Sequence, residues 1–230
     1  MSNHFNDFQL ATFGNPIFLG IDHPEAYKMT IPDYAPLTTE DLVYIGNTSD
    51  FFGVDPYTAT VVTPPSYGFA ACAANSSDTF FPYCANQSTL TSNGWDVCYR
   101  SQSYVYITPT YLRTYLFYLW NTFKKPVFIT EFGFPVWDEA DKEIHDQLFD
   151  TPRSLYYLSF MSEILKSIWE DHVNVMGALA WSFADIWEFG DYAQHFGIQT
   201  VNRTTQVRRY KKSFFDLVDL VNARMQSKSG

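Results

Sequence analysis

Apolar runs alternate with segments of helical periodicity along the second half of the chain, and this alternation most restricts its fold. In chain order we expect a strand near 50–58, a helix over 109–123, a strand near 126–131, a helix starting at 151, a strand near 175–183 and a helix over 212–225. This order is typical of parallel α/β architecture, in which functional residues lie at the carboxyl ends of the strands. The apolar character of the strands at 126–130 and 173–183 predicts that both are buried.

The first half of the chain is less regular. Residues 1–49 contain four prolines, and Thr38 to Asp41 resembles a helix start. The stretch 64–95 is rich in Ser, Asn, Gly, Pro and Cys and is too long for a simple connection, so we expect a functional or covering loop. We find no internal repeat and no dividing linker, which predicts a single domain over residues 1–230.

Composition and charge exclude several classes of protein. Of the 230 residues, 46% are hydrophobic and 19% aromatic, so the chain can bury a sizeable core and is not expected to be disordered. The net charge of −10 and the lack of a basic run with interleaved aromatics argue against nucleic acid as a partner. No stretch approaches the ~18 apolar residues of a membrane span.

The cysteines and glycosylation sequons bear on the compartment. Cys72, Cys84 and Cys98 lack CxxC spacing and nearby histidine pairs, so a zinc site is not expected, and one disulfide such as Cys72–Cys84 would fit an oxidising compartment. Sequons at 47, 75, 86 and 202 favour secretion of the parent protein, although the first six residues lack a signal-peptide layout.

Three strand ends carry residues capable of chemistry. Glu131 directly follows an apolar strand, and Gly133 allows a sharp turn just after it. Glu188 lies among aromatic residues, where a carboxylate either accepts strong hydrogen bonds or has a raised pKa. Tyr57 could donate a hydrogen bond to a neighbouring carboxylate. Taken singly, Glu131 also fits a helix cap or a surface acid after a strand. Glu188 also fits an acid paired with Arg or a backbone amide cluster, and Tyr57 an ordinary strand tyrosine.

Together, five ordered segments resemble family 1 glycoside hydrolases of the β-glucosidase type. Ile129–Gly133 resembles the family's I-T-E-N-G, Trp181–Phe189 its W-S-x-x-D-N-x-E-W, and Asp50–Thr58 its D-F-F-G-x-N-x-Y-T. Gly20–Pro24 and Arg208–Ser213 resemble its G-D-Y-P and R-x-x-K-x-S segments more loosely. The resemblance covers essentially the whole chain.

The resemblance implies a fold and a set of roles. The fold would be a partial (β/α)₈ barrel, comprising strands six to eight with their helices. Glu131 would be the nucleophile that forms a covalent glycosyl-enzyme intermediate, and Tyr57 would orient it. The residues implied to bind substrate are Trp181, Trp187, Glu188 and Phe189. The substrate would be a β-glycoside or oligosaccharide with a neutral glycone, and no metal or organic cofactor is implied.

Four positions depart from the family pattern. Phe132, Asp55 and Ile186 each replace an asparagine, and Phe189 replaces a tryptophan. Phenylalanine can stack on a sugar but cannot donate an indole N–H, so these changes bear on sugar specificity.

The second carboxylate that a retaining glycosidase needs is not found in this sequence. In the family it lies in a T-x-N-E-P segment at strand four, and this chain contains no N-E-P. The remaining glutamates at 139, 143, 163 and 170 are expected to be solvated. We therefore expect an open barrel fragment that does not hydrolyse glycosides efficiently alone and that associates through its exposed sheet edge. The alternative is a non-catalytic sugar-binding or interaction module derived from the family.

Overall fold

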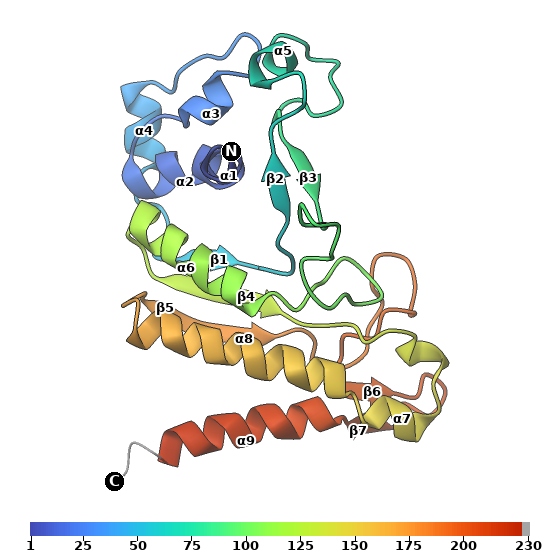
Figure 1. The fold of residues 1–230 in the computed structure, drawn as a ribbon. Coiled ribbons are helices and arrows are strands. Elements are labelled where there is room, and N and C mark those ends of the chain that lie inside the picture. The colour runs from blue at the N-terminus through green and yellow to red at the C-terminus, as the bar shows by residue number, and fades with distance from the viewer. Residues whose placement is uncertain (227–230) are drawn as a thin grey trace. The chain divides into compact units, whose positions relative to one another are not determined.

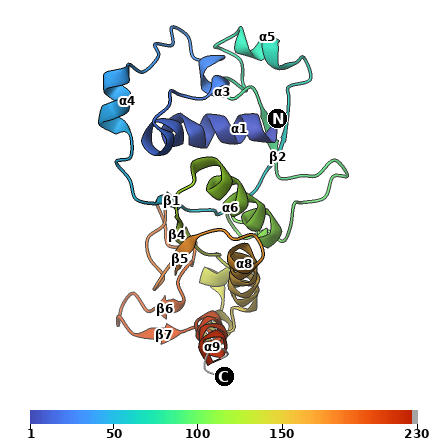
Figure 2. The same ribbon diagram turned by 90° about the vertical axis from the view of Figure 1, so that its left-hand side faces the viewer.

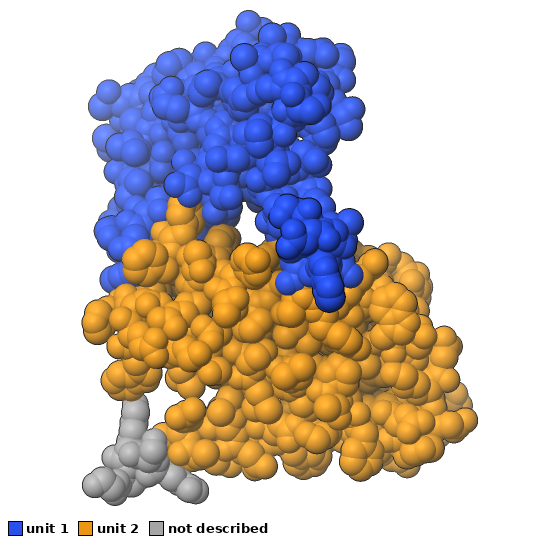
Figure 3. All heavy atoms as spheres, in the orientation of Figure 1, with its two compact units in different colours: residues 1–52, 60–97, 119–126 blue, residues 53–59, 98–118, 127–230 orange. Residues whose placement is uncertain are grey.

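The computed structural model describes residues 1–226, which form two compact units (Figure 3). The first unit comprises residues 1–52, 60–97 and 119–126, and the second comprises 53–59, 98–118 and the chain from 127 onward. Helices and strands alternate in the second unit, which confirms the expected α/β class. The expectation of a single domain stays a prediction.

The first unit begins with a helix that the sequence pattern did not reveal. The elements α1 (Ser2–Asn6), η1 (Asp7–Ala11), α2 (Thr12–Gly14) and η2 (Asn15–Leu19) follow one another without a break, with π-helical geometry in η1 and η2. The helix ends at Gly20, whose φ of 64° is the left-handed conformation common after a helix. Gly14 is required inside it, because a Cβ there would lie 2.3 Å from the ring of Phe123.

Short elements complete the first unit. They are α3 (Glu25–Lys28), α4 (Thr39–Ile45), β2 (Val61–Thr63), α5 (Phe69–Ala73) and β3 (Asn86–Ser88), and β2 pairs antiparallel with β3. The expected start of α4 is confirmed: Thr38 and Asp41 form a capping box, with reciprocal hydrogen bonds of 2.9 and 3.1 Å between side chain and backbone.

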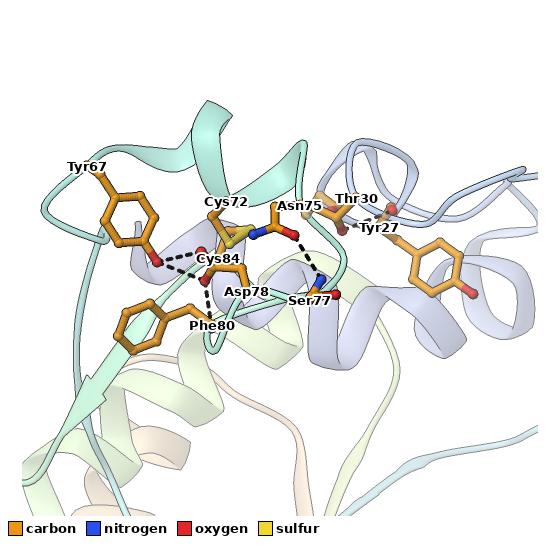
Figure 4. Close-up of a disulfide and its surroundings, with 10 residues drawn as sticks. Tyr27, Thr30, Tyr67, Cys72, Asn75, Ser77, Asp78, Phe80 and Cys84 are labelled. Carbon is orange, nitrogen blue, oxygen red and sulfur yellow. Dashed lines mark hydrogen bonds between the residues drawn. A yellow bond between two sulfur atoms is a disulfide. The ribbon is translucent and has the colours of Figure 1, made fainter.

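A disulfide joins Cys72 to Cys84, as the sequence suggested (Figure 4). Both cysteines are fully buried, whereas Cys98 is free and exposed. Beside the disulfide, the hydroxyl of Tyr67 donates to the carboxylate of Asp78 at 2.7 Å, and Asp78 also accepts from the backbone N–H of Phe80 at 2.9 Å. The 64–95 stretch is therefore an ordered, cross-linked segment.

The central sheet consists of three strands in the order β1–β4–β5: β1 (Phe52–Val54), β4 (Val127–Phe132) and β5 (Val175–Ala180). These positions confirm the three predicted strands. β4 and β5 are parallel, with Phe132 opposite Ala180 at their carboxyl ends. The sheet does not close among the described residues.

Helices lie between and after these strands. α6 (Pro109–Phe123), α8 (Thr151–Trp169) and α9 (Lys212–Gln226) confirm the three predicted helices, and α9 runs alongside α8 (Figures 1 and 2). The shorter elements of the second unit are η3 (Glu139–Asp141), α7 (Ile144–Leu148), β6 (Gln199–Val201) and β7 (Arg208–Tyr210). Its core includes Tyr156 stacked on Phe160, with ring centroids 4.0 Å apart. Among residues 1–226, no helix is both long and apolar enough to cross a membrane.

Two expectations about burial were wrong. β5 was expected to be buried, but Met176 and Leu179 are 59% and 54% exposed, because β5 pairs only with β4 and the described residues leave these side chains uncovered. Glu139 and Glu163 were expected to be solvated, but both are buried because each meets a cation, Arg153 and Lys166 respectively. Glu143 and Glu170 are exposed as expected.

The disulfide makes a testable contribution to stability. Replacing both Cys72 and Cys84 with alanine should lower the free energy of unfolding of the first unit by about 2–4 kcal/mol, since the bridge restricts the unfolded chain. Urea denaturation followed by circular dichroism would measure the change. The control, Cys98→Ala, removes an exposed free thiol and should leave stability nearly unchanged. Equal stability of the double variant and the control would contradict the prediction.

Candidate active site

Glu131 and Tyr57 meet at the carboxyl ends of neighbouring strands. Glu131 lies at the end of β4, and Tyr57 follows β1. The hydroxyl of Tyr57 donates a hydrogen bond to Oε2 of Glu131 at 2.9 Å. Thr130 reinforces this pairing, since its hydroxyl lies 2.6 Å from Oδ1 of Asp55. Burial and the adjacent Glu131 raise the pKa of Tyr57 well above its ordinary value, so the phenol stays protonated and remains a donor.

Gly133 follows β4 and permits a close approach to the segment after β5. A Cβ at this position would lie 1.9 Å from the carbonyl oxygen of Trp181, so only glycine allows the two backbones to approach this closely. The backbone N–H of Trp181 donates to the carbonyl of Phe132 at 2.7 Å. The ends of β4 and β5 are therefore joined immediately beside Glu131.

Trp181 and Glu188 form the second hydrogen-bonded pair. The indole N–H of Trp181 donates to Oε1 of Glu188 at 2.9 Å, and the Trp181 carbonyl accepts from the hydroxyl of Tyr157 at 2.9 Å. The peptide bond between Trp181 and Ser182 is cis. Glu188 is buried, and its burial raises the pKa of the carboxyl; the charge of Glu131 acts in the same direction, while the indole hydrogen bond opposes both.

The two pairs belong to one site. Glu131 and Trp181 line the same cavity of about 510 Å³, and the carboxylates of Glu131 and Glu188 are close enough for the first to affect the pKa of the second. The four side chains thus gather at the carboxyl ends of the strands. An isolated surface role for Glu131 is inconsistent with this arrangement.

Tyr104 also lies at this site, although no sequence motif indicated it. Its ring is 5.8 Å from that of Tyr57, and burial together with the charges of Glu188 and Glu131 raises its pKa. Tyr104 comes from the irregular segment before α6, which contains no strand end. Only its position after the predicted covering loop could have indicated it.

Trp187 and Phe189 are the two predicted substrate-binding residues outside the hydrogen-bonded pairs. They are 57% and 87% exposed. Glu188 and Asp191 exchange backbone hydrogen bonds of 2.9 and 3.2 Å, which closes a tight turn with Phe189 at its tip. Phe189 has a φ of 44°, a conformation that is unfavourable for a bulky side chain. Trp187 packs edge-on against Tyr192 instead, with ring centroids 4.9 Å apart.

The site is built from carboxylates, a phenol and an indole rather than from a metal-binding set. In the part of the chain that the structure describes, no three His, Cys, Asp or Glu side chains are arranged to hold a metal ion. The chemistry available to the side chains themselves is attack by a carboxylate, hydrogen bonding to hydroxyl groups and stacking on an apolar ring face.

Comparison with known proteins gives one consistent result. The family model for glycosyl hydrolase family 1 matches residues 1–225. Beta-glucosidase 1B of Phanerodontia chrysosporium is 32% identical over 92% of this chain and 37% of its own length. The cytosolic beta-glucosidase of Homo sapiens is 29% identical over 83% of this chain and 40% of its own length.

Solved structures agree with the sequence comparisons. Beta-glucosidase 2 from Trichoderma reesei, solved in complex with Tris, has a TM-score of 0.86 and 26% identity over 96% of this chain. A rice β-glucosidase has a TM-score of 0.84 and 26% identity over 94% of this chain. The chain covers 47% and 46% of these two structures, so it spans under half the length of its relatives. With its unclosed sheet, it has the fold expected of a partial (β/α)₈ barrel, and it belongs to glycosyl hydrolase family 1.

Proposed function

We propose that this chain carries the nucleophile and the glycone-binding residues of a β-glucosidase-like retaining glycoside hydrolase. The observation that carries the proposal is the hydrogen bond of 2.9 Å from Tyr57 to Glu131 at adjacent strand ends, beside the Trp181–Glu188 pair. A carboxylate held by one donor and lining a mostly apolar cavity that Trp181 and Phe183 also line is suited to attack an electrophilic carbon.

Glu131 is the group that attacks the anomeric carbon. Its carboxylate forms the glycosyl-enzyme bond as the glycosidic oxygen departs, and water then hydrolyses that bond. Tyr57 acts on Glu131 by positioning: its hydroxyl donates a hydrogen bond that fixes one carboxylate oxygen. Without this contact the carboxylate could rotate away from the line of attack.

Glu188 and Trp181 hold the sugar ring. The indole N–H occupies Oε1 of Glu188, and the second carboxylate oxygen is available to accept hydrogen bonds from hydroxyl groups. This orientation places the anomeric carbon in line with the nucleophile. A carboxylate at this position favours a neutral glycone such as glucose or galactose over a phosphorylated one, because a phosphate would be repelled. Trp187 and the exposed Phe189 supply aromatic faces at the rim of the site.

Departure of the glycosidic oxygen normally requires a second carboxyl group about 5–5.5 Å from the nucleophile. Glu188 is assigned to the glycone hydroxyls, and this sequence contains no N-E-P segment to supply the acid. The leaving group must therefore depart unaided in this chain.

Glu131 should therefore react with a substrate whose leaving group needs no acid. The dinitrophenyl β-glycoside of a fluorinated deoxyglucose has a good leaving group, and its fluorine slows breakdown of the glycosyl-enzyme. Intact-protein and peptide mass spectrometry should show one sugar attached to Glu131, with none on Glu131→Gln. Tyr57→Phe should label more slowly, by roughly ten-fold, because the carboxylate loses its orienting donor.

The matched control for labelling is Tyr99→Phe, which removes a phenol outside the described pairs while keeping a ring beside Phe134. It should label at the wild-type rate. Sugar attached to another carboxylate, or unchanged labelling of Glu131→Gln, would contradict the assignment of the nucleophile.

Ordinary substrates give the complementary prediction. An aryl β-glucoside whose leaving group needs protonation should be turned over at or near the background rate, because the chain supplies no acid at the scissile bond. Release of the phenol can be followed by absorbance. Robust turnover that is lost in Glu131→Gln would mean that another carboxyl group of this chain acts as the acid.

The raised pKa of Glu188 predicts a pH dependence of stability. Between the unfolded pKa of about 4.3 and the higher folded pKa, the folded state holds more protons, so the free energy of unfolding falls as pH rises through this window. Urea denaturation of wild type and Glu188→Gln at a series of pH values would isolate this term. The difference in free energy of unfolding between wild type and Glu188→Gln should change between these two pKa values. A difference that does not vary with pH would show that burial does not penalise ionised Glu188.

A second function, sugar binding without catalysis, is favoured by the combination of an assembled glycone site and a missing N-E-P segment. Calorimetric titration with gluconolactone distinguishes it from the first. Binding without covalent labelling of Glu131 would favour a binding module, and binding with labelling would favour the hydrolase.

A further inference from the structure

A buried cluster of charged side chains in the second unit is linked to the candidate site through Asp185, which lies between Trp181 and Glu188 in the chain. Its members come from the segment after β4, from the start of α8, from the segment after β5 and from the residue before α9. Each is at most 2% exposed. They are Glu139, Asp150, Arg153, Asp185 and Lys211.

Arg153 is the centre of one half of this cluster. Its guanidinium donates to Asp150 at 2.5 Å and to both carboxylate oxygens of Glu139. It also donates to the carbonyl oxygens of Phe134 and His195. Because every nitrogen of the guanidinium has a partner, Arg153 fixes the segments before and after α7 against the chain that leaves the candidate site.

Lys211 is the centre of the other half and links the cluster to the site. Its ammonium group lies 2.7 Å from Oε1 of Glu139 and 2.9 Å from Oδ1 of Asp185. Its backbone N–H donates to the carbonyl of Ile198 at 2.9 Å. Lys211 therefore connects the start of α9 to the segment after β5.

Asp185 lies within the segment that carries Trp181 and Glu188. Its Oδ1 accepts from Lys211 and from the backbone N–H of Gly197 at 2.9 Å. Its Oδ2 is buried, has no hydrogen-bond partner within the described part of the chain and lies 3.5 Å from Nδ1 of His195. Gly197 is needed for this packing, since a Cβ there would lie 2.2 Å from the Asp185 nitrogen.

The charge balance of the buried cluster depends on Lys211. With neutral His195, the cluster holds three carboxylates and two cations, so losing one cation leaves a larger uncompensated negative charge in the interior. Without Lys211, the carboxylate of Asp185 would retain, among residues 1–226, only the Gly197 amide as a hydrogen-bond donor. A buried carboxylate in that state is driven to move toward solvent or to take up a proton.

We propose that Lys211 is a positioning residue for the Trp181–Glu188 pair, acting through Asp185. Lys211 has no hydrogen bond to either side chain of the pair. Its ion pair with Asp185 fixes the backbone of the segment between Trp181 and Glu188. The benefit to sugar binding rests on the function proposed above, whereas the effect on the geometry of Trp181 does not.

The test uses the whole chain labelled with fluorotryptophan, with the six tryptophan resonances assigned by single Trp→Phe replacements. Lys211→Met should shift the fluorine resonance of Trp181 and increase hydrogen exchange at the amide of Gly197. The double variant Asp185→Asn/Lys211→Met removes the uncompensated charge and so should fold more readily, yet it still lacks the link and should show the same shift.

Arg113→Met is the matched control, because it breaks a two-pronged pair with Asp171, 2.6 and 2.8 Å, elsewhere in the same unit. It should lower thermal stability without moving the Trp181 resonance or the exchange rate at Gly197. The proposal would be overturned if the Trp181 resonance and the Gly197 exchange rate in both lysine variants matched those of wild type. It would also be overturned if Arg113→Met changed the two signals as much as the lysine variants do.

Sugar binding adds a separate arm. If wild type binds gluconolactone, the lysine variants should bind it on the order of ten-fold more weakly while Arg113→Met binds normally. If wild type does not bind, the proposed function fails, and the fluorine and exchange measurements still decide whether Lys211 positions Trp181.

Discussion

The parallel pairing of β4 with β5 determines where the candidate site can form. Phe132 lies opposite Ala180, and the next hydrogen bond, from the Trp181 N–H to the Phe132 carbonyl, joins the two strand ends. Glu131 and Trp181, far apart in sequence, are thereby placed at one edge of the sheet, as expected of parallel strands. Gly133 makes the junction possible, because any side chain there would collide with the backbone at Trp181.

The two carboxylates at this junction, Glu131 and Glu188, are each held by a donor from another side chain. Tyr57 donates to Glu131, and Trp181 donates to Glu188, so each carboxylate has one fixed oxygen. Burial disfavours two nearby negative charges, which is why the pKa of Glu188 is raised. In the buried cluster, Lys211 forms an ion pair with Asp185 and Arg153 forms one with Glu139, so these carboxylates are not left unpaired in the interior.

Local pattern was sufficient to predict much of this arrangement. The three strands and three long helices follow from periodicity, and Glu131 and Tyr57 were expected at neighbouring strand ends. The helix from Ser2 to Leu19 was missed because Gly14 and Pro16 are helix-breaking signals locally, whereas tertiary contact with Phe123 explains the glycine. Tyr104 and the burial of Glu139 depend on side chains from distant segments, which no local pattern encodes. The family resemblance supplied the roles, which periodicity could not.

The central claim is that Glu131 and Glu188 act on one sugar ring. A crystal structure of the chain with bound gluconolactone tests it most directly. We expect the lactone carbon, which corresponds to the anomeric carbon, to lie within contact distance of the Glu131 carboxylate, while ring hydroxyls donate to Glu188 and the ring packs near Trp181. A lactone bound away from Glu131, or one that contacts only one of the two carboxylates, would contradict the account.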